Sequence, residues 1–259
     1  MTNSILLEVN NNIAFITLNR PEKFNSFNRE MALQLQNILD ECAANKSLRC
    51  IYLTGNGKAF SAGQDLAELT QENPPTISQI LVEHYNPIIT RIRNIELPVV
   101  CAVNGVAAGA GANIALACDI VVATETANFI QAFSKIGLIP DSGGTYILPR
   151  LIGFQKASAL MMLGDKISAK DASEIGMIYK YFSDDNFEAE SVKLATILAS
   201  MPTKGLVYTK QLLNQSATNN LQQQLILEDE FQKKAAATKD YKEGVDAFLE
   251  KRKPNFIGE

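Results

Sequence analysis

Short runs of β-branched residues alternate with helical patterns along most of this chain, and such alternation is typical of βα units. Residues 5–9 and 13–18 predict a hairpin, and buried strands are expected at residues 50–54, 99–103 and 120–123. A chain of 259 residues, 46% of them hydrophobic, can bury one large core, or one core with a small helical appendage. The sequence therefore predicts an α/β fold.

Helix signals are clearest after the first hairpin. Asn28 is placed to cap a helix with one apolar stripe, and a helix of small residues is expected at about residues 111–117. Ser168 and Asp171 form a capping-box pattern at the start of a later helix. The apolar stripe consists of Met31, Leu35, Ile38, Leu39 and Cys42.

The last sixty residues lack strand patterns and are predicted to be helical throughout, beginning at Pro202. We therefore expect a core over residues 1–200 and a helical region over residues 201–259. Leu221 and Leu225 share a helix face with polar residues, so only part of that face is apolar. This face is expected to pack against something outside its own core, such as another subunit.

Charge and residue counts exclude several classes of protein. A net charge of −4 argues against a nucleic-acid-binding protein, because phosphate binding needs a concentrated basic face. No apolar run approaches the ~20 residues that span a bilayer, so we expect no membrane association and a cytoplasmic location. His84 is the only histidine, and the four cysteines stand singly, so we expect no metal site, no histidine-dependent triad, and buried free thiols.

Two glycine-containing loops follow predicted strands. Residues 57–66 read GKAFSAGQDL, and residues 104–112 read NGVAAGAGA. Small side chains let a ligand approach the backbone closely. Side by side at the ends of neighbouring strands, the loops would form a cleft with convergent N–H donors, which suits an enolate oxygen. The same small residues would equally suit tight packing of a helix on a sheet.

Five ordered motifs resemble the crotonase, or enoyl-CoA hydratase/isomerase, superfamily along nearly the whole chain. They read LNRPEKFNSFN, GKAFSAGQDL, PVVCAVNGVAAGAGANIALACDI, IGLIPDSGGTYILPRLIG and EGVDAFLEKRKPNF. The resemblance implies a spiral core of ββα turns followed by a C-terminal helical trimerisation region, in a homotrimer or a dimer of trimers. It also implies an acyl-CoA substrate, with coenzyme A as part of the substrate and no separate cofactor.

The resemblance also implies roles for individual residues. The backbone N–H groups of Gln64 and Ala110 would form an oxyanion hole that grips the thioester carbonyl. Phe248 and Lys251 would reach the nucleotide of a neighbouring subunit. The adenine and pantetheine path would be lined by residues of the first two motifs, namely Lys23, Phe24, Ala62, Gly63, Asp65 and Leu66.

The chain departs from the hydratases that it resembles at two positions. Those enzymes place one glutamate in the helix after the second loop and another about twenty residues later, where this chain has Asn113 and Phe133. Hydration of a double bond needs water to be held and activated, ordinarily by paired acid and base groups. An amide and a phenyl ring cannot supply that pair, so plain hydratase activity is not expected.

The remaining acid is Asp141 in IPDSGGT, which by resemblance faces the acyl chain. VNGVAAGAGA, AFSKIGLIPDSGGT and HYNP are similar to family members that isomerise ring-1,2-epoxyphenylacetyl-CoA. Asp141 would remove a proton and return it elsewhere, in an apolar pocket of Phe133, Ile136 and Leu138 that raises its pKa. Alternatively, Asp141 caps a helix that opens at Ser142.

Three functions follow from this interpretation. The first is an isomerase that converts the ring epoxide to oxepin-CoA and shifts the double bond of 3-enoyl-CoA to the 2 position. The second is a general 3,2-enoyl-CoA isomerase of fatty-acid oxidation, which differs in the shape of its acyl pocket. The third is a non-catalytic homologue that binds CoA thioesters without exchanging solvent deuterium into the acyl chain.

Overall fold

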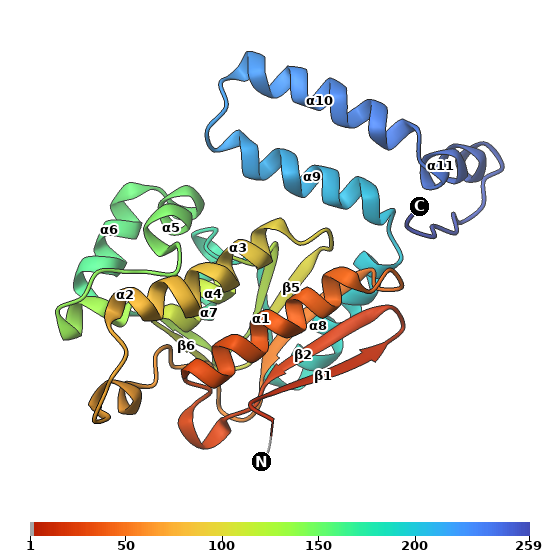
Figure 1. Cartoon of the computed structure of the whole chain (residues 1–259). Helices are drawn as coiled ribbons and strands as arrows, with labels where there is room; N and C mark the ends of the chain where they lie inside the picture. The colour runs from red at the N-terminus through yellow and green to blue at the C-terminus, as the bar shows by residue number, and fades with distance from the viewer. Residues whose placement is uncertain (1–2) are drawn as a thin grey trace.

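Two β-sheets organise the computed structural model, which describes residues 3–259 (Figure 1). The strands are β1 (Ile5–Asn10), β2 (Ile13–Leu18), β3 (Cys50–Gly55), β4 (Ala59–Ser61), β5 (Val99–Val103), β6 (Val106–Ala108), β7 (Ile120–Thr124), β8 (Asn128–Ile130), β9 (Lys166–Ser168) and β10 (Lys180–Phe182). The larger sheet has the order β1-β2-β3-β5-β7-β10, and the smaller has the order β4-β6-β8-β9. Only the pairs β1–β2 and β8–β9 are antiparallel.

Helices cover both faces of the larger sheet. They are α1 (Arg29–Ala44), α2 (Ile77–Gln79), α3 (Asn86–Asn94), α4 (Ala110–Leu116), α5 (Gly144–Ile152), α6 (Phe154–Leu163), α7 (Ala169–Glu174), α8 (Asp184–Ala199), α9 (Thr203–Ser216), α10 (Leu221–Ala236) and α11 (Lys239–Leu249). Shorter turns are the 3₁₀ helices η1 (Pro21–Lys23), η2 (Leu66–Thr70) and η4 (Ala132–Ile136), and the π-helix η3 (Ile80–Tyr85). Asn28 caps α1 by accepting a hydrogen bond from the Met31 amide, as predicted.

The side chains of the central strands are buried on both faces of the larger sheet. On β3, Ile51 and Leu53 join the main core with α1, whereas Cys50 and Tyr52 pack in a second cluster that includes Phe187 of α8. Successive side chains of a strand point to opposite faces, so a fully apolar strand must be covered on both sides. The predicted buried strands and the predicted hairpin are confirmed, and all four cysteines are buried free thiols.

The smaller sheet was not expected from the sequence, because its strands have only three residues each. β4 lies inside the first glycine-containing loop, and β6 lies inside the second. Each of β3, β5 and β7 is therefore followed by a short strand of the smaller sheet and then by a helical segment, η2, α4 or η4. This repetition is a ββα spiral, and it confirms the predicted α/β fold class.

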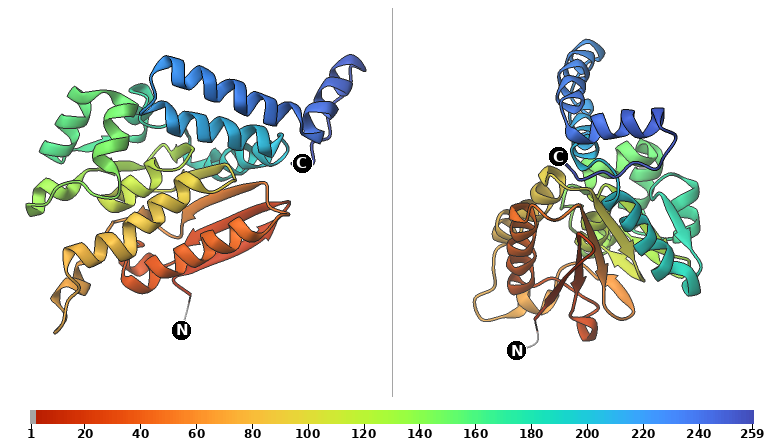
Figure 2. Two further views of the ribbon diagram at one scale, coloured as in Figure 1. Left: turned by 45° about the horizontal axis from the view of Figure 1, so that its top comes forward. Right: turned by 90° about the vertical axis from the view of Figure 1, so that its right-hand side faces the viewer.

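The C-terminal helices extend away from the core, as Figures 1 and 2 show. The prediction that the last sixty residues are helical throughout is wrong for residues 250–259. These residues follow α11 in an irregular path, held by hydrogen bonds from the Ile257 and Gly258 amides to the buried Asp240 carboxylate. Lys210 joins α9 to the core. It forms an ion pair with Asp119 at 2.8 Å and donates hydrogen bonds to the Ile92 and Leu97 carbonyls.

Among the described residues, no helix combines the length and apolar character needed to cross a bilayer.

Candidate active site

The two glycine-containing loops lie side by side, as expected. β4 and β6 pair in parallel within them. Gly63 has a φ of +86°, and a methyl group added there would lie 2.8 Å from the Ala108 carbonyl oxygen and 3.3 Å from the Ala110 amide nitrogen. A methyl group at Gly111 would lie 2.6 Å from the Ser61 carbonyl oxygen. Glycine is therefore required at these positions for the two backbones to approach.

The amides of Gln64 and Ala110 are available to a ligand. The Gly63 carbonyl accepts a hydrogen bond from the Phe27 amide at 2.7 Å, and because a peptide unit is planar and trans, the Gln64 N–H points the opposite way. Ala110 is the first residue of α4, where an N–H has no acceptor within the helix. Across residues 3–259, neither N–H donates a hydrogen bond to the protein.

Asp141 is half-buried just before α5. Burial raises the pKa of its carboxyl, and the Ser142 hydroxyl, which donates to Oδ1 at 2.8 Å, offsets part of that shift. The alternative role as a helix cap is wrong, because α5 begins at Gly144 rather than Ser142, and its N-cap is Gly143 without a side-chain bond. The carboxylate is thus left for another task.

Asn113 connects the Asp141 turn to α4. It is fully buried, donates from Nδ2 to the Asp141 carbonyl oxygen at 2.8 Å, and accepts at Oδ1 from Gln131 Nε2 at 2.8 Å. A methyl group at Gly144 would lie 2.4 Å from Asn113 Nδ2, so the turn packs directly on this amide. One short helix therefore positions both Ala110, at its first residue, and the backbone of Asp141.

Tyr85 and Glu68 also belong to this region, although the sequence predicted no role for either residue. The buried Tyr85 hydroxyl donates to Gln64 Oε1 at 2.7 Å, and Gln64 Nε2 donates to Glu68 Oε2 at 2.7 Å. Burial, followed by the charges of Asp141, Glu68 and Asp65, raises the pKa of Tyr85 well above its ordinary value. The hydroxyl therefore keeps its proton, and Asp141 is near enough to influence it.

The expected apolar pocket around Asp141 is only partly present. Phe133 is buried, with its ring 3.8 Å from the position that a methyl group at Gly109 would occupy, so it lies against the second loop. Ile136 is 57% exposed and Leu138 is 40% exposed, so neither encloses the carboxyl within one chain. Both side chains are at the surface near the end of η4, and residue type alone does not predict that they are exposed.

The expected substrate path forms a surface where the first two motifs meet. The Ala62 amide donates to the Phe24 carbonyl at 2.9 Å, and Lys23, Phe24, Ala62 and Leu66 are exposed. Asp65 also serves the fold, since it pairs with Arg20 at 2.8 Å and caps η2 by accepting from the Ala67 amide.

His84 is buried beside this region. Burial is the main cause that lowers its pKa, and its Nδ1 has no hydrogen-bond partner within residues 3–259. No group of three or more His, Cys, Asp or Glu side chains in those residues is arranged to hold a metal ion. The carboxyl of Asp141 and the two free amides are therefore the polar groups that this arrangement leaves for chemistry.

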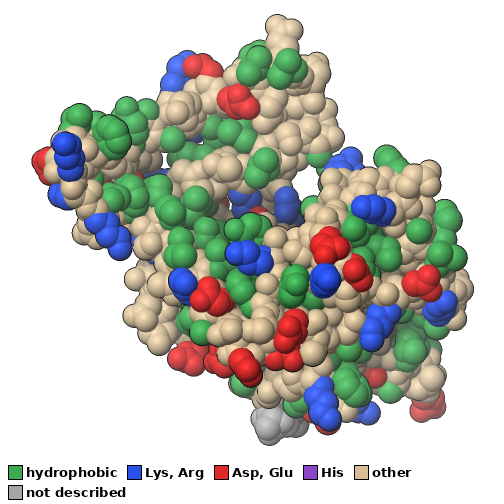
Figure 3. Space-filling view, turned by 180° about the vertical axis from the view of Figure 1, so that it is seen from behind, with side chains coloured by type: hydrophobic (Ala, Val, Ile, Leu, Met, Phe, Trp, Pro, Cys, Tyr) green, Lys and Arg blue, Asp and Glu red, His purple; other side chains and the backbone are tan. Residues whose placement is uncertain are grey.

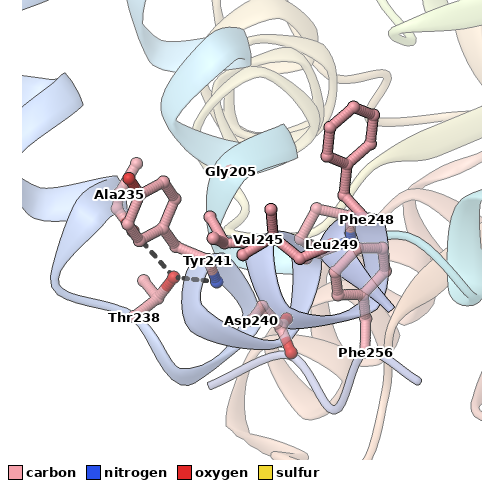
Figure 4. Close-up of a pocket in the computed structure, with 11 residues that line it drawn as sticks. Gly205, Ala235, Thr238, Asp240, Tyr241, Val245, Phe248, Leu249 and Phe256 are labelled. Atoms are coloured by element: carbon pink, nitrogen blue, oxygen red, sulfur yellow. Dashed lines mark hydrogen bonds between the residues drawn. The ribbon is translucent and has the colours of Figure 1, made fainter. Parts of the chain in front are cut away.

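Phe248 and Lys251 are not brought to the loops by a single chain. Phe248 lies near the end of α11 and Lys251 just after it, and Figure 1 shows this helix on the opposite side of the molecule from α2. Figure 4 shows Phe248 with Tyr241, Val245 and Leu249 along an apolar groove between α11 and the start of α9. Any contact of Phe248 or Lys251 with a substrate held by the loops would require a second copy of the chain.

Comparisons with known proteins find relatives along the whole length of the chain. The Enoyl-CoA hydratase/isomerase family model matches residues 8–259. The chain is 46% identical over 261 residues to the 1,2-epoxyphenylacetyl-CoA isomerase of Escherichia coli (strain K12), covering all of both chains. It is 41% identical over 255 residues to a probable enoyl-CoA hydratase of Rhodobacter capsulatus, covering 98% of each.

The fold also matches those of solved structures. The crystal structure of an enoyl-CoA hydratase from Bacillus anthracis matches with a TM-score of 0.92 at 32% identity, covering 99% of this chain and 100% of that one. The ββα spiral and the C-terminal helices are thus shared with solved structures over the full length. The chain belongs to the enoyl-CoA hydratase/isomerase family.

Proposed function

We propose that this protein is an acyl-CoA isomerase in which Asp141 transfers a proton while the amides of Gln64 and Ala110 hold the thioester oxygen. The observation that carries the proposal is the half-buried Asp141 carboxyl, whose residue is held by its backbone carbonyl, through Asn113, to the helix that begins at Ala110. Its raised pKa suits a group that serves first as a base and then as an acid.

Removal of a proton from the acyl chain places negative charge on the thioester oxygen. Two prearranged amides stabilise that charge more than they stabilise the neutral carbonyl, and each donor can contribute roughly 3 kcal/mol. Asp141 takes the proton from one carbon, the electron pair moves into the dienolate, and Asp141 returns the proton to another carbon. The double bond is displaced with no net change in atoms, and no cofactor is needed beyond the coenzyme A of the substrate.

For the acyl group, we propose ring-1,2-epoxyphenylacetyl-CoA, converted to oxepin-CoA, together with linear 3-enoyl-CoA thioesters. The support is the 46% identity to a relative whose name gives the epoxide activity. Another relative is named a hydratase, but here Asn113 and Phe133 leave one carboxyl rather than a pair over the acyl chain. A general 3,2-enoyl-CoA isomerase would share this chemistry and differ in its acyl pocket.

We further propose that the active unit is a homotrimer or a dimer of trimers. The C-terminal helices leave large apolar side chains exposed, and hydrophobic side chains gather over this part of the surface in Figure 3. Phe248 is 82% exposed and Leu221 is 75% exposed, which is costly unless another surface covers them. A neighbouring copy would also bring Phe248 and Lys251 to the nucleotide.

The proposal is tested by incubating the purified protein in heavy water with the ring epoxide thioester and, separately, with a linear 3-enoyl-CoA. Mass spectrometry then follows both product and deuterium. Conversion of the epoxide with deuterium uptake supports the full proposal, whereas turnover of the linear substrate alone supports the general isomerase. Thioester binding with neither product nor deuterium uptake from the solvent, for both substrates, would identify a non-catalytic homologue and overturn the assignment of Asp141.

A further inference from the structure

The Gln64 side chain is held at both of its polar atoms, which is unusual for a residue whose proposed role lies in its backbone. Its Oε1 accepts from the Tyr85 hydroxyl at 2.7 Å, and its Nε2 donates to Glu68 Oε2 at 2.7 Å. Tyr85 is 1% exposed and Glu68 is 8% exposed. Both bonds therefore lie in an environment where water competes poorly and the geometry is well defined.

This network ties the first loop to two helices. Glu68 Oε1 also accepts from the Arg29 amide at 2.9 Å, at the first residue of α1. Tyr85 is the last residue of η3, a π-helical segment, and such segments often occur at functional sites. The Gly63–Gln64 peptide is held from the other side by the Phe27 amide.

We propose that Tyr85 is a positioning residue that acts through the Gln64 side chain to aim the Gln64 N–H at the thioester oxygen. The inference rests on the proposed function, because it assigns a purpose to the support of one oxyanion donor. Phe27 fixes the plane of the peptide, and Tyr85 with Glu68 prevents rotation of the residue that carries the N–H. Tyr85 need not touch the substrate in this role.

Tyr85→Phe keeps the buried ring and removes only the hydroxyl. We expect kcat to fall about tenfold, the factor that one neutral hydrogen bond can be worth, with KM changed by less than about twofold. Gln64→Leu keeps the backbone N–H but loses both side-chain bonds, so it should lower kcat at least as much. Because both changes interrupt one network, Tyr85→Phe should add little in the Gln64→Leu background.

Tyr52→Phe is the matched control. The Tyr52 hydroxyl is paired with Ser191 Oγ at 2.8 Å and is also buried, but it lies between β3 and α8 on the other face of the larger sheet. Its removal should cost a similar amount of stability and leave kcat unchanged. Equal losses of kcat in Tyr52→Phe and Tyr85→Phe would mean that general destabilisation, rather than positioning, explains the effect.

The deciding measurement is the infrared carbonyl stretch of a bound, unreactive acyl-CoA labelled with ¹³C at the thioester carbon. Hydrogen bonds to the oxygen lower this frequency. We expect a lowered frequency in wild type and Asp141→Asn, and a frequency closer to that of free thioester in Tyr85→Phe. An unchanged shift in Tyr85→Phe would overturn the positioning role alone. No shift in saturated wild type would overturn the oxyanion hole, and with it both proposals.

Discussion

The core that carries the site and the C-terminal helices are stabilised in different ways. Around Asp141 and Ala110 the contacts are buried amides and glycines that leave no space for a methyl group. The C-terminal helices join the core through a few polar anchors, chiefly Lys210, and leave residues such as Leu221 and Phe248 exposed. The difference fits the proposal that one chain builds the site for proton transfer, and the proposal that a neighbouring copy covers the C-terminal surface.

Lys210→Met should produce the largest effect on stability. It removes the cation that pairs with Asp119 and donates to two carbonyls, leaving a poorly solvated carboxylate without its main partner. We expect the free energy of unfolding to fall by about 3 kcal/mol in urea denaturation. Lys193→Met, which breaks an exposed pair with Glu190, should change it by less than about 0.5 kcal/mol. Similar values for both variants would show that α9 is not anchored as described.

Asp141→Asn should produce the largest effect on activity. The amide keeps the size of the side chain but cannot accept the proton, so isomerisation should fall at least ~100-fold, or by about 2.7 kcal/mol of barrier. Thioester binding, measured by calorimetry, should persist because the amides of Gln64 and Ala110 remain. Residual activity above about a tenth of wild type would remove Asp141 from its role.

The same carboxyl predicts opposite trends with pH for activity and stability. Activity should decline as pH falls through the raised pKa of Asp141, because the protonated acid cannot act as a base. Since the folded pKa lies above the unfolded pKa, the contribution of Asp141 to stability is present below the unfolded pKa and is lost as pH rises through the folded pKa. Asp141→Asn should therefore be slightly more stable than wild type at neutral pH in thermal denaturation. A lower melting temperature than wild type would contradict this burial argument.

Asn113→Leu tests the connection between α4 and the Asp141 turn. The substitution leaves Gln131 Nε2 without its acceptor. It also leaves the Asp141 carbonyl with one donor, the Gly144 amide. We expect a loss of about 2 kcal/mol in stability and roughly a tenfold loss in kcat. Tyr52→Phe, which removes the buried bond to Ser191 on the other face of the larger sheet, should lower stability without changing kcat. If kcat of Asn113→Leu stayed at the wild-type value, the turn would not depend on this amide.

Leu225→Glu should have the smallest effect on folding and a clear effect on assembly. Leu225 is 54% exposed on α10, so its replacement should change the free energy of unfolding by less than about 0.5 kcal/mol. Sedimentation should nevertheless show smaller species than wild type, because a charge is placed in the proposed subunit contact. Val9→Glu, at a similarly exposed apolar residue of β1, is the control. Identical sedimentation of all three proteins would mean that α10 is not in an interface.

Local patterns in the sequence predicted much of the core. The apolar stripe after Asn28 and the buried run at residues 50–54 are signals within a few residues, and the structure confirms both. The strands of the smaller sheet were missed because three-residue strands carry no periodicity. The exposure of Ile136 at the end of η4 could not be predicted either, since it depends on the packing of distant segments.

The candidate site was predictable where backbone and motif define it, and not where side chains from distant segments meet. Gly63 and Ala110 lie in motifs. The bond from Tyr85 to Gln64 instead joins residues 21 positions apart, and Tyr85 is at the end of a π-helix. The HYNP motif contains Tyr85, but nothing in the motif indicates a bond to Gln64. The spacing of Asn113 and Asp141 in the sequence does not indicate that the Asn113 side chain binds the Asp141 backbone carbonyl.

The proposed isomerase requires one carboxyl over an acyl chain whose thioester oxygen is held by two amides. A crystal structure of Asp141→Asn with bound 3-enoyl-CoA would show both parts of this arrangement. We predict a thioester oxygen about 3 Å from both the Gln64 and Ala110 nitrogens, with the residue-141 amide about 3.5 Å from the carbons that exchange the proton. A thioester oxygen in solvent, or an acyl chain directed away from residue 141, would contradict the account.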